Sequence, residues 1–311
     1  LWVQDFFEFA GSPPERAKNA DLVIGNPPWE SGLPESAEHF LTDPKRTKRT
    51  VGDKQIAQAF LWAAPELCKP EGRICLVAPS KGLLFNASGP NQQFRREFLS
   101  AFRVDLIVNF SALRRTMFSK AVGPAAPVVY RPVPPPDEHK IVYCCPKPWN
   151  SAEDGWNYVI AHTDIQHIPP AIAADNPHVW KTAMWGGPRD WELVSRLSTL
   201  RSLGDHATAM GWTHAEGFIL AKNKREKAEW LTGKPYVDVD ALQRFTIDEA
   251  GLPPLTETLF YRAAKKNKSI FDGPHLLFGQ GPKAERGFVA TLVRGPAVFS
   301  QSIVGIAGSQ T

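Results

Sequence analysis

Four consecutive residues, Asn26-Pro27-Pro28-Trp29, carry the clearest chemical signal in this sequence of 311 residues. A proline fixes φ at about −65° and has no backbone N–H group, so the turn is stiff and its prolines can only accept hydrogen bonds. The Asn26 side-chain oxygen and the Pro27 carbonyl can each accept one hydrogen of an amino group and draw its nitrogen toward tetrahedral geometry, which frees the lone pair to attack an electrophilic methyl group. Trp29 offers a flat face for stacking a base. We therefore predict an amino-methylation site whose catalytic residues are Asn26, Pro27, Pro28 and Trp29, with Trp29 also stacking on the base.

The residues before this turn predict the element that positions it. Residues 21–24 form an apolar run without alternation, which is typical of a parallel strand covered on both faces. Open α/β sheets bind ligands at the carboxyl ends of their strands. A stiff turn with no catalytic role is the alternative, but its place directly after such a strand favours a functional site.

Helix and strand patterns alternate as far as residue 135. Apolar residues at helical spacing predict a helix from Ile56, with Asp53 as a candidate N-cap and a break at Pro65. Further patterns predict strands over 73–78, 104–110 and 126–130, and a helix over 94–102. The proline-rich stretch 132–136 predicts a boundary. We expect an α/β catalytic domain over 1–135 and an α+β domain over 136–311.

Composition sets the class of protein. The formal net charge is +4, which allows nucleic-acid binding without requiring it. Hydrophobic residues make up 43% of the chain, which is enough for packed cores. The four cysteines have neither zinc spacing nor the pattern of a disulfide framework, so we expect no metal site and a reducing compartment. The sequence has no stretch long enough to span a membrane and no signal peptide. These features predict a cytoplasmic protein with no membrane partner.

Basic residues gather in two parts of the chain. The stretch 30–52 includes Lys45, Arg46, Lys48 and Arg49, and we expect a mobile surface loop there, with phosphate contact as the alternative. In the second half, six basic residues are candidates for contact with the DNA backbone, a solvated charged surface being the alternative. These six are Lys222, Lys224, Arg225, Lys265, Lys266 and Lys268.

The first 135 residues resemble the adenine-N6 DNA methyltransferases in which the cofactor motifs precede the catalytic motif. The resemblance implies an α/β fold, the C-terminal part of the Rossmann-like sheet of a methyltransferase. It also implies S-adenosylmethionine as the cofactor. It assigns cofactor binding to Asp5, which would contact the adenine amino group, to Phe6, which would pack on the adenine ring, and to Asn26. It also makes Phe118 a candidate for stacking on the flipped base, with simple core packing as the alternative.

Asn-Pro-Pro-Trp with a long following segment is similar to the large methylases of restriction-modification and phage-defence systems. This resemblance implies methyl transfer to N6 of an adenine flipped from double-stranded DNA, target recognition by residues 136–311, a bacterial or archaeal cytoplasm, and restriction subunits or a fused nuclease domain as partners. The glycine-rich cofactor loop of the family should precede Asp5, so we expect a fragment that is inactive alone and binds the cofactor weakly. Gly279 and Gly281 fit part of such a loop, but Pro282 suits the required helix start poorly, and a loop near DNA phosphate is expected there.

Two other functions stay open. RNA base methyltransferases and methyltransferases that act on protein glutamine share the tetrapeptide, but they generally end soon after the last strand of the sheet, whereas residues 136–311 follow here. The chain could also be a non-catalytic DNA-recognition module, because the glycine-rich loop is missing. Retention of the intact tetrapeptide favours an enzyme.

Overall fold

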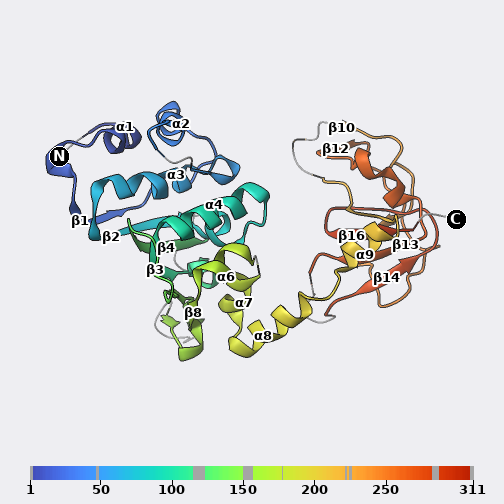
Figure 1. Ribbon diagram of the computed structural model, residues 1–311. Coiled ribbons are helices and arrows are strands. Elements are labelled where there is room, and N and C mark those ends of the chain that lie inside the picture. The colour runs from blue at the N-terminus through green and yellow to red at the C-terminus, as the bar shows by residue number, and fades with distance from the viewer. Residues whose placement is uncertain are drawn as a thin grey trace. The chain divides into compact units, whose positions relative to one another are not determined.

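In the computed structural model, the described residues are 3–46, 49–114, 123–149, 157–176, 178–220, 223, 226–281 and 287–308. The chain divides into two compact units, Leu1–Leu197 and Ser198–Thr311 (Figure 1). Among the described residues, no helix combines the length and the apolar character needed to cross a membrane.

The first unit is built on a six-stranded mixed sheet with strand order β1-β2-β4-β3-β5-β8. Its strands are β1 (Ala20–Gly25), β2 (Cys68–Pro79), β3 (Arg103–Val108), β4 (Ala125–Arg131), β5 (Ile141–Cys144) and β8 (Ile165–Ile168). The pairs β1–β2 and β3–β5 are parallel, whereas β4 is antiparallel to both β2 and β3, and β8 is antiparallel to β5. The strands β1, β2, β3 and β5 therefore point the same way, and their carboxyl ends share one edge of the sheet.

Helices pack against this sheet, and Figure 1 shows α3 and α4 lying across it. The α-helices of the unit are α1 (Phe6–Gly11), α2 (Glu35–Thr42), α3 (Ile56–Ala63), α4 (Gly89–Ala101), α6 (Pro170–Asp175), α7 (Val179–Trp185) and α8 (Pro188–Leu197). Phe94 and Phe98 lie four residues apart on one face of α4, and both contact the Trp62 ring of α3 edge-on, at 5.9 and 5.6 Å between centroids. Burial of these rings, at about 1.5–3 kcal/mol for a phenylalanine-sized side chain, holds the two helices on the sheet.

The predicted α/β class of the first unit is confirmed, and so are the parallel pairing of the strand before Asn26 and the helix break at Pro65, where α3 gives way to a 3-10 helix. The expectation that this strand is covered on both faces is wrong for the described residues. Leu22 and Ile24 are 57% and 74% exposed, so the face of β1 that carries both side chains is uncovered. The strand also lies at an edge of the sheet, where only β2 pairs with it among the described strands.

The first unit does not end at the proline-rich stretch. Residues 132–136 connect β4 to β5, two strands of the same sheet, and β8 extends this sheet further. Arg96 of α4 also forms an ion pair with Asp175 of α6, at 2.6 Å. The structure therefore divides between residues 197 and 198 and not after residue 135. The separate prediction that the later residues recognise DNA concerns function and stays a prediction.

The second unit contains an antiparallel sheet of order β14-β13-β16-β9. Its strands are β9 (Thr213–Glu216), β13 (His275–Gly279), β14 (Ala290–Val293) and β16 (Ile303–Ala307). Two short pairs accompany it, β10 (Glu226–Lys227) with β12 (Leu259–Phe260) and β11 (Tyr236–Val237) with β15 (Val298–Phe299), together with the helix α9 (Leu203–Ala209). Phe218, Phe260, Phe271 and Phe299 are fully buried in its core. The predicted α+β character is confirmed.

Candidate active site

The tetrapeptide lies at the carboxyl end of β1, where the sequence predicts it. The strand ends at Gly25, and Asn26 is exposed directly after it. Pro27 is buried, and Trp29 is half-buried. The indole Nε1 of Trp29 donates a hydrogen bond to the carbonyl oxygen of Val77 in the neighbouring strand β2, at 3.2 Å. The Trp29 ring, which is predicted to stack on a base, is thus anchored to the sheet.

The ladder geometry explains why Val77 accepts this bond. Ser80 N donates to Pro124 O at the end of the antiparallel β2–β4 pair, and hydrogen bonding alternates along such a pair. Val77 therefore directs its carbonyl toward β1. If the β1–β2 register continued by one residue, this carbonyl would need the N–H of residue 27, which proline lacks. The indole N–H of Trp29 supplies the missing donor.

The chain leaving the turn is fastened to the start of α3. Gly32 N donates to Lys54 O at 2.9 Å, and Ile56 N donates to Glu30 O at 3.3 Å. These backbone bonds act like a short antiparallel bridge between residues 30–32 and 54–56. The exit from the Trp29 turn is therefore held on both sides, by β2 and by the segment that begins α3.

A buried amide network supports that segment. Gln58 and Asn91 are 3% and 0% exposed; Gln58 Nε2 donates to Asn91 Oδ1 at 2.8 Å, and Asn91 Nδ2 donates to Asp53 Oδ2 at 2.7 Å. Asp53 and Lys54 both have left-handed backbone conformations, with φ of 50° and 53°. Asp53 does not cap α3, which begins without a side-chain cap; its carboxylate holds Asn91 instead. Sequence reasoning missed Gln58 and Asn91, because a polar residue within a helical pattern suggests a solvent-facing position.

Polar side chains also meet at the carboxyl ends of β2 and β3. Ser80 Oγ donates to Asn109 Oδ1 at 3.2 Å, and Asn109 Nδ2 donates to the Tyr143 hydroxyl at 2.7 Å. Burial raises the pKa of Tyr143, so its phenol stays neutral. Asn109 also caps the 3-10 helix Phe110–Leu113, which leads toward the predicted stacking residue Phe118. Phe118 itself lies outside the described residues.

The predicted cofactor residues have structural contacts of their own. Asp5 is exposed and caps α1, its Oδ1 accepting from Phe7 N at 2.8 Å and Glu8 N at 3.1 Å. Phe6 is half-buried and stacks on Phe60, with centroids 4.4 Å apart and an interplanar angle of 11°. An exposed carboxylate next to a partly accessible ring fits the amino group and ring of an adenine, so the residues are compatible with the predicted role.

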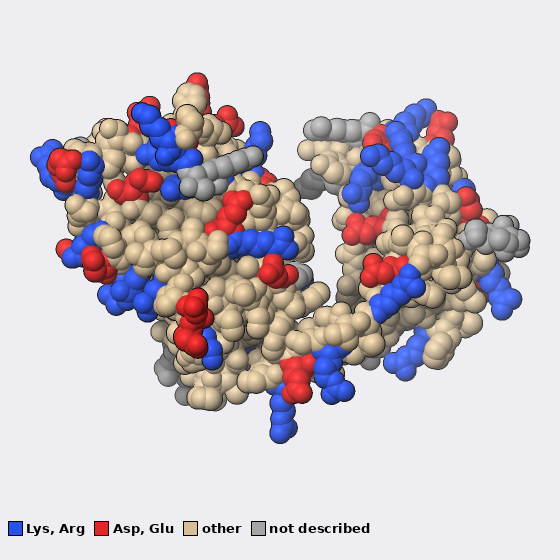
Figure 2. All heavy atoms as spheres, in the orientation of Figure 1, with Lys and Arg blue, Asp and Glu red and all other residues tan. Residues whose placement is uncertain are grey.

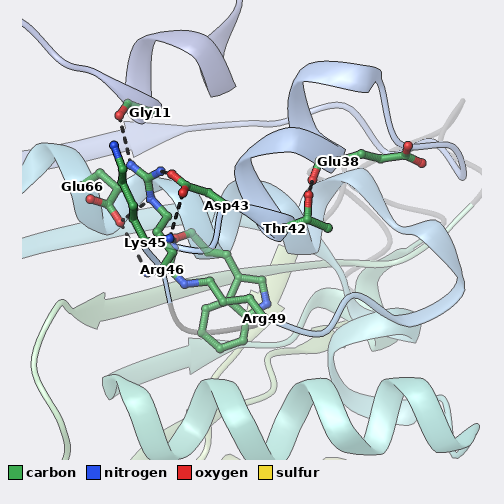
Figure 3. Close-up of polar contacts among 9 residues, drawn as sticks. Gly11, Glu38, Thr42, Asp43, Lys45, Arg46, Arg49 and Glu66 are labelled. Carbon is green, nitrogen blue, oxygen red and sulfur yellow. Dashed lines mark hydrogen bonds and ion pairs between the residues drawn. The ribbon is translucent and has the colours of Figure 1, made fainter.

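The basic stretch after α2 is not free to bind phosphate through its arginines. Figure 3 shows Arg46 bonded to Asp43, to the Gly11 carbonyl at 3.0 Å and to Glu66 at 3.6 Å. Arg49 pairs with the same Glu66 at 3.3 Å. The two arginine side chains are only 18% and 16% exposed. They tie the stretch to α1 and to the end of α3, and the alternative of phosphate contact does not hold for these two residues.

The predicted DNA-backbone residues are described only in part. Lys265 and Lys266 line an open cavity of about 530 Å³ in the second unit, and Lys268 Nζ lies 5.0 Å from the centroid of the Trp230 ring. The structure therefore brings these three lysines together on the 3-10 helix Lys265–Phe271. The other three candidates, Lys222, Lys224 and Arg225, lie outside the described residues.

Comparison with known proteins supports the resemblance found in the sequence. Residues 1–115 match the family model of the Eco57I restriction-modification methylase. The resemblance to restriction-modification methylases is thereby confirmed over these residues. No curated protein matches the chain.

Several solved structures are similar in part. The methyltransferase subunit of a type I restriction-modification system from Streptococcus thermophilus is 18% identical, with 45% of this chain and 29% of that chain covered and a TM-score of 0.36. The type IIL restriction-modification enzyme MmeI, in complex with DNA, is 12% identical, with 93% and 41% covered and a TM-score of 0.46. The type IIG restriction endonuclease BpuSI is 12% identical, with 99% and 43% covered and a TM-score of 0.42. The chain thus spans less than half the length of each of these proteins.

Proposed function

We propose that the full-length protein transfers a methyl group from S-adenosylmethionine to N6 of an adenine flipped out of double-stranded DNA, within a restriction-modification or phage-defence system. One observation carries the proposal: Asn26-Pro27-Pro28-Trp29 stands at the carboxyl end of β1, with Asn26 exposed and Trp29 anchored to β2. The family match over residues 1–115 supports a methylase. The adenine target rests on the tetrapeptide.

The residues of the chain stabilise the charge that develops on the attacking nitrogen. Asn26 Oδ1 and the Pro27 carbonyl accept the two amino hydrogens, and they strengthen these bonds as N6 becomes positive in the transition state. Trp29 holds the plane of the base, and its π face favours the cationic transition state. The lone pair of the neutral amino group attacks, and the cationic N6 formed then releases one proton to water, so the attack itself needs no general base. Bound S-adenosylmethionine supplies the electrophilic methyl group, with Asp5 and Phe6 holding its adenine.

Residues outside the catalytic turn complete the proposed contacts with DNA. Phe118 is the proposed second aromatic residue that stacks on the flipped base. The backbone phosphates are neutralised by basic residues of the second unit, with restriction subunits or a fused nuclease domain as further partners. The proposed basic residues are Lys222, Lys224, Arg225, Lys265, Lys266 and Lys268.

Replacement of Asn26 by alanine tests the proposal. In the full-length protein, Asn26→Ala should lower single-turnover transfer of labelled methyl groups to duplex DNA by about 10²- to 10³-fold, the loss typical of one preorganised transition-state hydrogen bond. The affinity for DNA should stay the same. Asn176→Ala, at the end of α6, is the matched control and should keep the parent rate.

The identity of the methylated group decides between the proposed function and its rivals. Digestion of the product should yield N6-methyladenine as the only labelled nucleoside. Label on cytosine, on RNA alone or on a protein glutamine would overturn the adenine assignment. A full-length protein that binds DNA but transfers no methyl group to any of these would instead be a recognition module.

A further inference from the structure

The open cavity of the second unit is lined by charged side chains of both signs. The side chains of its lining that can form hydrogen bonds include His214, Glu216, Glu226, Arg262, Lys265 and Lys266. Figure 2 shows acidic side chains lying beside basic ones on the visible face of this unit. A surface that only neutralised phosphate would gain nothing from carboxylates, which repel phosphate. Both glutamates pair with basic side chains of the lining, Glu216 with Arg262 and Glu226 with Lys265, so the cavity presents acceptor groups next to donor groups.

Glu216 of the cavity lining binds two polar side chains, Arg262, which also lines the cavity, and Gln280, which lies next to it outside the lining. Glu216 Oε1 accepts a hydrogen bond from Gln280 Nε2 at 2.8 Å, and Glu216 Oε2 pairs with Arg262 Nη2 at 3.3 Å. Glu216 ends β9, and Gln280 directly follows β13. Both strands pair with β16, near its first residues, so the two side chains come from the same end of the sheet. The Glu216 and Arg262 side chains are 47% and 53% exposed, which leaves donor and acceptor positions open to a ligand.

The backbone around these side chains is fixed. Glu226 Oε2 accepts from Ala263 N at 2.9 Å and pairs with Lys265 at 3.7 Å. Ala264 has a left-handed conformation, with φ of 53°, which is uncommon for a residue other than glycine and persists only where the surroundings impose it. After Glu216, a β-carbon at Gly217 would lie 1.8 Å from a backbone carbonyl oxygen of β15. The side chains are therefore presented from a rigid frame.

We infer that Arg262, Glu216 and Gln280 read base edges in a groove of double-stranded DNA, while Lys265 and Lys266 beside them contact phosphate. This inference rests on the proposed function of the protein as a DNA methylase. Arginine donates two hydrogen bonds to guanine, glutamine pairs with adenine through one acceptor and one donor, and a carboxylate accepts from the cytosine amino group. The bonds that join the three side chains limit their rotamers before DNA arrives, which lowers the entropy lost on binding.

Selection of bound duplexes from a random-sequence library tests the inference. The full-length parent protein is compared with Arg262→Gln and Glu216→Gln, each of which keeps a polar side chain of similar length. Arg244→Gln and Glu229→Gln are matched controls, because both are exposed residues of the second unit that do not line the cavity. Each cavity variant should lower the preference for one base at one position by about 5- to 150-fold, the range for one side-chain contact with a base edge. The controls should keep the parent sequence preference.

The outcomes separate this inference from the proposed function. If both cavity variants keep the parent preference at every position, or if the parent selects no sequence, the cavity does not read bases. If the parent selects a sequence but methylates no DNA, base reading stands and the methylase proposal fails. Thermal unfolding of each variant shows that it is folded, which we expect because the replaced side chains are about half exposed. If one cavity variant is unfolded, the sequence preference of the other cavity variant tests the inference.

Discussion

The indole N–H of Trp29 can be removed without removing an aromatic face. In Trp29→Phe the hydrogen bond to Val77 O, 3.2 Å long, is lost while the ring can still stack on a base. The backbone cannot replace the lost donor, because residue 27 of the neighbouring strand end is a proline. The substitution therefore isolates the anchor of the ring from its stacking face.

The expected size of the effect follows from the burial of the site. A hydrogen bond of this kind contributes about 0.5–1.5 kcal/mol net, and Trp29 is half-buried, so water can reach the Val77 carbonyl and partly replace the donor. We expect Trp29→Phe to cost about 1 kcal/mol of stability, a fall in Tm of about 2–4 °C for a domain of this size. If the same bond also fixes the ring plane during transfer, about 1 kcal/mol corresponds to a fivefold slower step.

Two measurements on the full-length protein check this reasoning, with Trp29→Ala as the comparison. Differential scanning calorimetry gives the Tm, and single-turnover methyl transfer gives the rate. Trp29→Ala loses the stacking face as well, worth about 1–3 kcal/mol per base, so its transfer rate should fall about 5- to 150-fold below that of Trp29→Phe. If Trp29→Phe matches the parent in both Tm and rate, the bond to Val77 is not the anchor. If the two variants transfer methyl equally fast, Trp29 does not stack on the base.

Three further predictions concern the support of the site, the sheet and the second unit. Asn91→Ala removes three buried or partly buried hydrogen bonds and should cost about 2–4 kcal/mol in urea unfolding; a cost below about 1 kcal/mol would contradict the network. Burial raises the pKa of Asp105, but hydrogen bonds from Arg131 and Arg103, both 2.8 Å long, outweigh it and lower the pKa; its stabilisation is present above the unfolded value of about 3.9 and is lost as the pH falls through the folded pKa. Asp105→Asn should thus cost about 1 kcal/mol at neutral pH and almost nothing at the acid end, and an equal cost at both would refute the assignment. Alanine at all three lysines of the 3-10 helix should flatten the slope of log K against log salt for DNA binding by up to about 2.7 units, and an unchanged slope would place the phosphate contacts elsewhere; these lysines are Lys265, Lys266 and Lys268.

The order of β1, α3, β2, α4, β3 and β4 was predictable because its signals are local, whereas the mobile loop expected over 30–52 is wrong where α2 (Glu35–Thr42) lies. The apolar run before Asn26 and the spacing of Phe94 and Phe98 predict β1 and α4, although α4 begins at Gly89, five residues before the predicted start, and ends at Ala101. The end of the unit was not predictable from the proline-rich stretch, since prolines mark a turn between β4 and β5 in the same way as they mark a linker. Only the pairing of β5 with β3, a contact distant in sequence, shows that the sheet continues.

The features of the candidate site divide in the same way, into those that local sequence signals predict and those that depend on contacts distant in sequence. The place of the tetrapeptide follows from the sequence, because a turn after a parallel strand must lie at the carboxyl edge of the sheet. The partners that hold it do not follow, since Gln58 and Asn91 meet across 33 residues of chain. The roles of Arg46 and Arg49 were also hidden, because a basic side chain that pairs with a nearby carboxylate has the same sequence signal as one that binds phosphate.

The prolines of the tetrapeptide connect its chemistry to its mechanical support. The proline at position 27 fixes the backbone that carries the carbonyl proposed to accept an amino hydrogen, and the same residue cannot donate to Val77 in the β1–β2 ladder. The indole N–H of Trp29 donates to the Val77 carbonyl in its place. This hydrogen bond holds the ring against the sheet, close in sequence to the exposed Asn26. The residue that shapes the acceptor thus also determines where the aromatic ring binds. Of phenylalanine, tyrosine and tryptophan, only tryptophan carries an N–H donor on its ring, so this anchor favours Trp over Phe at position 29, whereas stacking alone would accept either ring.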